Sequence, residues 1–128
     1  MCPVVVARGG TPYLALGASG GRKIVAAVLQ LASFVIDFGM DLEAAAHAPR
    51  LDASGADLTT LDRRLDAVVV DAVGALGPVE RVEHTIAPGQ FANPNMVSRD
   101  EAGFNVGVAD AMSPWSAAVA EPEPEPGR

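Results

Sequence analysis

The sequence predicts an α+β fold built in layers. Two strand-like segments open the chain on either side of Gly9 and Gly10, which tolerate the positive φ angles of a tight hairpin turn. Residues 24–38 then form a nearly continuous apolar segment, in which the few polar residues follow helical spacing. A helix of this kind must be covered on most sides, so we expect it to pack on a sheet and to be flanked by a further layer.

Composition indicates a folded domain and limits its partners. The chain has 128 residues, enough for one core, with 49% hydrophobic and 20% charged residues. A net charge of −7 has the wrong sign for nucleic acid and for anionic membranes. The longest apolar segment is shorter than the roughly twenty residues of a membrane span. No export signal is visible at the start, so the compartment stays unknown.

The first helix is expected to follow a glycine-rich turn at residues 17–21 and to end at Gly39, which suits a left-handed cap. One narrow polar stripe runs along it: Gln30, Ser33 and Asp37. We expect Asp37 to bond a neighbouring backbone group or a cation. Asp41 can cap a short second helix over residues 42–47, and Pro49 stops it.

A third helix is expected over residues 61–76. Thr59 or Thr60 can cap it, and its apolar positions follow helical spacing as far as Gly77. Asp62 is then expected to face solvent.

Strands are expected over residues 79–86, 96–98 and 104–108, the last two joined by a turn. The domain is therefore expected to fill residues 1–120. The tail, residues 121–128, alternates glutamate and proline, so it is expected to be disordered.

The glycine turn fits neither common phosphate-binding pattern. Arg22 stands where Gly-Lys-Ser/Thr would be needed, and Gly-x-Gly-x-x-Gly spacing is absent. Two interpretations remain open. The backbone N–H groups at a helix N-terminus can hold an anion, or the oxyanion of a reacting carbonyl. Alternatively, the turn needs its glycines only for their backbone freedom.

No metal and no cofactor are expected. His47 and His84 have no partners at metal-ligand spacing, so each is expected to be a surface or helix-end histidine.

Several short motifs stand in a distinctive order along residues 1–50. They are Met1-Cys2-Pro3, the hairpin glycines, Leu16-Gly17-Ala18-Ser19-Gly20-Gly21-Arg22-Lys23-Ile24, Val35-Ile36-Asp37-Phe38-Gly39-Met40-Asp41-Leu42 and Ala48-Pro49-Arg50. This order resembles the small subunit of gamma-glutamyltransferases, whose stretches read Met-Ser-Pro, Gly-Ser-Pro-Gly-Gly, Ile-Asp-Phe-Gly-Met and Ala-Pro-Arg. Beyond residue 50 the resemblance weakens, although Gly107-Val108-Ala109-Asp110 looks like the family's terminal strand and Asp-containing turn.

The resemblance implies part of an N-terminal-nucleophile hydrolase, a four-layer αββα sandwich matured by self-cleavage into two subunits. In this family a threonine attacks the gamma-glutamyl carbonyl of glutathione-type substrates and passes the acyl group to water or an amine. The family's glycine pair supplies the oxyanion-hole N–H groups, a role that the resemblance assigns to Gly20 and Gly21. The implied partners are the rest of the small subunit and the large subunit, and such enzymes are usually periplasmic or secreted.

The departures concern the nucleophile. In the family it precedes the Met-Ser-Pro stretch, as do most substrate-binding groups, so we expect the isolated chain to be inactive. Thr59 and Thr60 resemble the nucleophile's Thr-Thr pair but follow the glycines, in the wrong order. Removal of Met1 would leave Cys2 as an N-terminal nucleophile, although the resemblance places an ordinary strand serine there.

Two alternatives remain for the function. One is an acylase of glutaryl or poly-gamma-glutamyl amides on the same scaffold. The other is a non-catalytic remnant or module that binds a partner through an uncovered sheet face.

Overall fold

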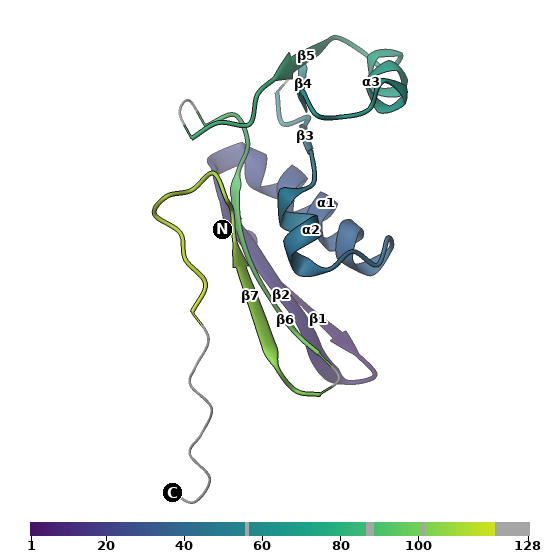
Figure 1. Cartoon of the computed structure of the whole chain (residues 1–128). Coiled ribbons are helices and arrows are strands. Elements are labelled where there is room, and N and C mark those ends of the chain that lie inside the picture. Colours follow the sequence, from purple (N-terminus) through teal and green to yellow (C-terminus); the bar gives the residue numbers. More distant parts are fainter. Residues whose placement is uncertain (56, 87–88, 101, 120–128) are drawn as a thin grey trace, which may run out of the picture.

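The computed structural model describes residues 1–55, 57–86, 89–100 and 102–119. The expected disorder of residues 121–128 falls outside this part. The elements in chain order are β1 (Val4–Arg8), β2 (Thr11–Ser19), the 3-10 turn η1 (Gly21–Lys23), α1 (Ile24–Ile36), α2 (Leu42–His47), β3 (Leu51–Asp52), β4 (Thr59–Asp62), α3 (Ala67–Gly74), β5 (Val79–Val82), β6 (Asn93–Arg99) and β7 (Asn105–Ala109). Figure 1 shows α1 and α2 on one face of a large sheet, and a small sheet with α3 at one end.

The large sheet has the strand order β1-β2-β6-β7 and is antiparallel throughout. The expected opening hairpin is confirmed: Gly9 and Gly10 both have positive φ, 59° and 84°. The expected second hairpin also forms, because β6 and β7 pair from Arg99 with Asn105 to Asn95 with Ala109. The two hairpins join through β2 and β6, where Leu16 lies opposite Met96.

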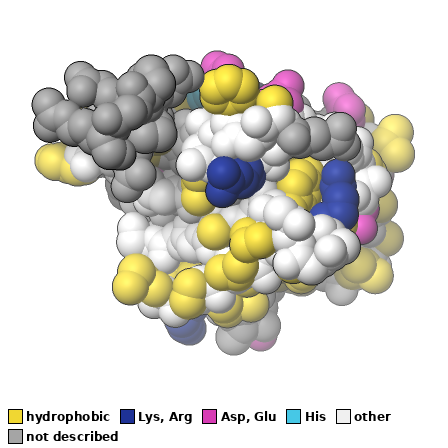
Figure 2. Space-filling view, turned by 90° about the horizontal axis from the view of Figure 1, so that it is seen from below, with side chains coloured by type: hydrophobic (Ala, Val, Ile, Leu, Met, Phe, Trp, Pro, Cys, Tyr) yellow, Lys and Arg dark blue, Asp and Glu magenta, His cyan; other side chains and the backbone are white. Residues whose placement is uncertain are grey.

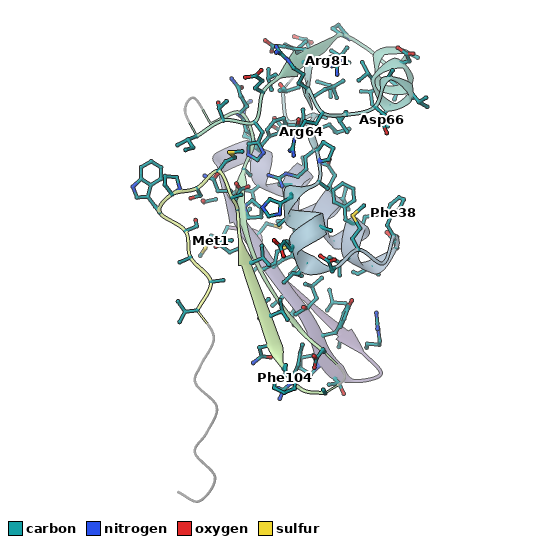
Figure 3. The ribbon with its side chains drawn as sticks, in the orientation of Figure 1. Met1, Phe38, Arg64, Asp66, Arg81 and Phe104 are labelled. Atoms are coloured by element: carbon teal, nitrogen blue, oxygen red, sulfur yellow. The ribbon has the colours of Figure 1, made fainter. Side chains whose placement is uncertain are left out.

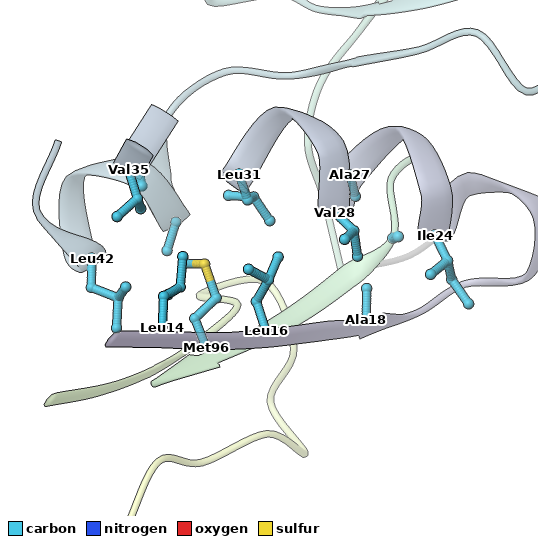
Figure 4. Close-up of a cluster of buried hydrophobic side chains, with 13 residues drawn as sticks. Leu14, Leu16, Ala18, Ile24, Ala27, Val28, Leu31, Val35, Leu42 and Met96 are labelled. Carbon is cyan, nitrogen blue, oxygen red and sulfur yellow. The ribbon is translucent and has the colours of Figure 1, made fainter. Parts of the chain in front are cut away.

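The core lies between this sheet and α1 (Figure 4). Alternate residues of β2 point to one face, so Leu14, Leu16 and Ala18 are all buried there. They meet the buried side of α1, which includes Val28 and the fully buried Leu31. Each buried leucine contributes roughly 1.5–3 kcal/mol. The opposite side of α1 stays open to solvent, with Leu29 69% exposed.

The polar stripe on α1 ties the helix to its neighbours. Gln30 donates its side-chain amide to Leu51 O at 2.7 Å and accepts from Leu51 N at 2.9 Å, which fixes β3 against the helix. Asp37 instead accepts the Ser33 hydroxyl at 2.6 Å, so neither of the partners expected for it is the one observed.

The connection from α1 to α2 follows the expected chemistry. Gly39 has the positive φ, 66°, that permits the chain to turn after α1. The Asp41 carboxylate then accepts the Ala44 N–H at 2.7 Å and caps α2, as expected.

The expected helix over residues 61–76 is wrong in its first half. Thr59 to Asp62 form β4, which pairs with β3 antiparallel and with β5 parallel. Threonine is β-branched and suits a strand that has partners on both sides. The helix begins at Ala67 instead, after the N-cap residue Asp66. Asp62 is 1% exposed, so its expected solvent position is also wrong.

The expected strand over residues 79–86 is shorter in the structure, since β5 ends at Val82, whereas β6 is longer than expected. Among the helices of the described residues, none has the length and apolar character needed to cross a membrane.

Leu31→Ala is expected to lower the free energy of unfolding by about 2–5 kcal/mol, because it leaves a cavity between α1 and the sheet. Leu29→Ala, on the exposed side of the same helix, is the matched control and should change it by about 0.5 kcal/mol at most. Urea denaturation followed by circular dichroism measures both. Equal losses for the two variants would contradict the assignment of the core.

Candidate functional site

The glycine turn lies at the end of β2, where the chain enters η1 and then α1. Gly20 has φ 143° and Gly21 has φ 62°, conformations that residues with a side chain rarely adopt. Both residues are exposed. Lys23 N closes the turn by donating to Gly20 O at 3.3 Å. The two glycines are therefore needed for this backbone path, and the turn presents its main chain to solvent.

The backbone N–H groups of the turn are free to hold an anion. Within the described part of the chain, no group accepts a hydrogen bond from Gly20 N or Gly21 N. Arg22 and Lys23 follow directly, and their positive charges favour a negative group nearby. Lys23 Nζ itself donates to Gly89 O at 3.0 Å, which ties the turn to the segment before β6.

The back of the turn rests against Ala92. A Cβ added to Gly20 would lie 2.8 Å from Ala92 Cα and 2.9 Å from its Cβ, closer than real contacts allow. Only glycine fits at position 20, for this reason as well as for its φ. Ala92 is 1% exposed, so the turn has a rigid support.

A buried ionic cluster contacts the carbonyl oxygen of Ala92, with Arg50 at its centre. Arg50 Nη2 contacts Asp110 Oδ2 at 3.0 Å, and the two side chains are 2% and 1% exposed. Arg50 also donates to Ala46 O at 3.0 Å and to Ala92 O at 3.4 Å. Removing one partner of such a pair typically costs about 3–5 kcal/mol.

His84 completes the cluster. Its Nε2 lies 3.8 Å from Asp110 Oδ1, and its ring meets Phe91 edge-on with centroids 5.2 Å apart. The expectation of a surface histidine is wrong, since the side chain is only 9% exposed. Burial lowers the pKa of His84, and the nearby Arg50 charge lowers it further, while the Asp110 carboxylate only partly offsets them.

A second ion pair lies at the end of β4 in the small sheet, and its arginine, Arg64 (labelled in Figure 3), also reaches the end of α2. Arg64 contacts the buried carboxylate of Asp62 at 2.6 Å and donates to His47 O at 2.9 Å. Burial alone would raise the pKa of Asp62, but hydrogen bonds from Arg64 and its charge outweigh burial and hold the pKa below its usual value. Asp62 therefore stays ionised.

The other residues singled out in the sequence do not converge on the turn. Thr59 and Thr60 belong to β4 of the small sheet, so neither is a helix cap. His47 is exposed in the last turn of α2, as expected for a helix-end histidine. Cys2 is half-buried against the core, just ahead of β1. No three His, Cys, Asp or Glu residues in the described ranges form a metal-binding group.

Sequence reasoning missed the ionic cluster as a unit. Both the Ala48-Pro49-Arg50 motif and Asp110 were visible in the resemblance, but nothing in the sequence joined them. The two partners are 60 positions apart in the sequence and become close only when α2 and the end of β7 meet.

The stability of the chain should fall as the pH drops below about 6.5, the ordinary pKa of histidine. Because the folded chain depresses the pKa of His84, the unfolded chain binds more protons between the two pKa values, so acid favours unfolding. Urea denaturation at pH 7.5 and pH 5.5 measures the effect. His84→Gln should reduce this pH dependence, whereas the exposed His47→Gln should keep it. If the pH dependence of stability were unchanged in His84→Gln, this role of His84 would be contradicted.

Comparison with known proteins places these features in a family. The sequence profile of the family described as gamma-glutamyltranspeptidase matches residues 1–120. A glutathione hydrolase proenzyme of Bacillus subtilis is 31% identical over 112 residues, which is 87% of this chain and 18% of that protein. The Escherichia coli glutathione hydrolase proenzyme is 38% identical over 50 residues, 39% of this chain and 9% of that protein. The chain thus spans less than a fifth of these relatives.

Solved structures agree on the fold. The gamma-glutamyltranspeptidase of Helicobacter pylori superposes with a TM-score of 0.72 at 24% identity, covering 88% of this chain and 61% of that one. The cephalosporin acylase of Bacillus halodurans gives a TM-score of 0.71 at 21% identity, covering 83% of this chain and 20% of that one. The expected α+β fold, part of a four-layer sandwich of the N-terminal-nucleophile hydrolase type, is confirmed. The chain belongs to the gamma-glutamyltranspeptidase family.

Proposed function

We propose that this chain supplies the oxyanion-binding turn of an enzyme that transfers or hydrolyses gamma-glutamyl groups, with the nucleophile supplied by the rest of that enzyme. One observation carries the proposal. Gly20 and Gly21 are exposed residues with positive φ angles at the start of a helix, at the position that the resemblance gives to the family's glycine pair. The relatives' name, glutathione hydrolase, supports gamma-glutamyl amides as the substrate class.

The proposed role of the turn follows from where negative charge develops during the reaction. When a nucleophile attacks the gamma-glutamyl carbonyl, its oxygen becomes an anion that needs donors already in place. The backbone N–H groups of the turn provide such donors without having to reorganise. The contact with Ala92 restricts movement of the Gly20 backbone, and the positive charge of Arg22, the next residue after the pair, favours the anionic intermediate.

The remainder of the enzyme is proposed to cover the outer face of the large sheet, the face turned away from α1. A hollow of about 410 Å³ opens on this face, lined mostly by small or apolar residues together with Asn95 and Asn105. Val5 is 73% exposed and Val97 is 41% exposed, and Ala15 is small enough to leave room for side chains of a facing sheet, whereas the space beside Gly107 is already filled by Ala118 of this chain. Figure 2 shows, at the lower end of the molecule, hydrophobic side chains open to solvent beside Lys or Arg groups.

The likeness to a cephalosporin acylase keeps an acylase of the same scaffold as a second candidate. Both candidates use the same turn and differ in groups that contact the rest of the acyl chain. Hydrolysis of glutaryl amides but not gamma-glutamyl amides by the assembled enzyme would favour the acylase.

The turn can be tested in a chimera. In the Bacillus subtilis relative, the aligned stretch is replaced by this chain, and kcat is measured with gamma-glutamyl-p-nitroanilide. Gly21→Ala keeps the backbone N–H but disfavours the φ of 62°, so the donor is expected to move away from the oxyanion and kcat to fall by up to about 10²-fold, the scale of losing one oxyanion donor.

Gly39→Ala is the matched control for this variant. Gly39 has φ 66° against 62° for Gly21, and an added Cβ would meet no atom within 4 Å at either position. The backbone strain is therefore comparable, and we expect kcat of the control to stay close to that of the parent chimera. Equal losses in the two variants, or full activity in Gly21→Ala, would contradict the proposal.

The purified chain alone is expected to release no nitroaniline from gamma-glutamyl-p-nitroanilide above the buffer rate, because an oxyanion site without a nucleophile has no intermediate to stabilise. A spectrophotometric assay with and without prior removal of Met1 measures this. Turnover that disappears in Cys2→Ala would overturn the expectation and identify the thiol as nucleophile.

A further inference from the structure

We infer that the buried ion pair of Arg50 and Asp110 positions the glycine turn, acting through the backbone of Ala92. The inference rests on the proposed function only where it gives the glycine turn a role in catalysis. The mechanical coupling itself is a property of this chain and can be measured without turnover.

The first link is the contact between Gly20 and Ala92. The space that a Cβ would need at Gly20 is already filled by Ala92 Cα and Cβ, at 2.8 and 2.9 Å from its position. The main chain of Gly20 thus lies directly against the Cα and the methyl group of Ala92, with no longer, flexible side chain between them to absorb movement. A shift of Ala92 by a few tenths of an ångström must shift Gly20 as well, because close-packed groups transmit displacement.

The second link is the grip of Arg50 on Ala92. Nη2 donates both to Ala92 O at 3.4 Å and to Asp110 Oδ2 at 3.0 Å, while Nη1 donates to Ala46 O at 3.0 Å. The guanidinium is planar, so these contacts fix one orientation of the whole group. Asp110 N in turn donates to Pro94 O at 2.9 Å, which anchors the carboxylate to β6 two residues after Ala92.

Two further contacts hold the same short segment, residues 89–92. His84 contacts Asp110 and packs on Phe91, the residue before Ala92. Lys23, from the turn itself, reaches Gly89 O at 3.0 Å. Residues 89–92 therefore contact both the glycine turn and the ionic cluster. Through these contacts the buried ion pair sets the backbone geometry of the exposed turn.

The alternative is that the ion pair only stabilises the fold. Asp62 provides the comparison, since it too is a buried carboxylate, 2% exposed, that pairs with an arginine, although the side chain of Arg64 is 52% exposed. Its partner Arg64 reaches His47 O and makes no hydrogen bond to Ala92 in the described residues. A purely structural role predicts the same behaviour for Asp62→Asn and Asp110→Asn, whereas positioning predicts a local change at the turn for Asp110→Asn alone.

The experiment measures ¹⁵N relaxation of the full chain and the order parameters of the Gly20 and Gly21 amides. In the native chain we expect values near about 0.85, and in Asp110→Asn values below about 0.6, with β2 amides unchanged. Asp62→Asn should leave both glycines near about 0.85. Unchanged order at the glycines in folded Asp110→Asn, or an equal loss in Asp62→Asn, would overturn the inference.

Ala92→Gly tests the same link if Asp110→Asn does not fold, because it removes the Ala92 methyl that lies against Gly20 and leaves the ion pair intact. Disorder confined to Gly20 and Gly21 supports the coupling, and unchanged order at both contradicts it. If the order parameters respond as expected while Gly21→Ala remains fully active in the chimera, the coupling stands and the proposed function fails.

Discussion

The guanidinium of Arg50 enters the interior where α2 ends and meets the carboxylate of Asp110 where β7 ends, in a space that water does not reach. Two charges placed there are costly unless each has its partner, so α2, β6 and β7 must come together for either charge to be buried. Arg50 O also accepts from Asp62 N at 2.9 Å, which links the small sheet to the same point. The two sheets, the helices and the glycine turn are thus organised around one ion pair.

The two faces of the large sheet differ, because α1 packs on one of them and the other is more open. Between α1 and the large sheet, leucine and valine side chains form a dry core of the kind that stabilises a domain. The other face of the sheet carries small and apolar residues around a broad hollow. Together with the match to less than a fifth of its relatives' length, this asymmetry supports a chain that works as one part of a larger sandwich.

Local rules predicted much of the fold. The first hairpin, the cap at Asp41 and the helix α1 depend on residues that are close in the sequence. Each of them is therefore predicted correctly. The region of β4 was not, because Thr59 to Asp62 have both strand and helix-start character and only pairing with β3 and β5 decides between them. The glycine pair could be proposed from sequence, but its support by Ala92 and the burial of His84 depend on contacts between distant segments.

The N–H groups of Gly20 and Gly21 are proposed to bind the oxyanion of a gamma-glutamyl intermediate. A crystal structure of the chimera with a gamma-glutamyl boronic acid, whose tetrahedral anion imitates that intermediate, tests it most directly. We expect one boronate oxygen to lie about 2.7–3.1 Å from the backbone nitrogens of both glycines. A boronate oxygen held by other donors, with both glycine nitrogens beyond about 3.5 Å, would contradict it.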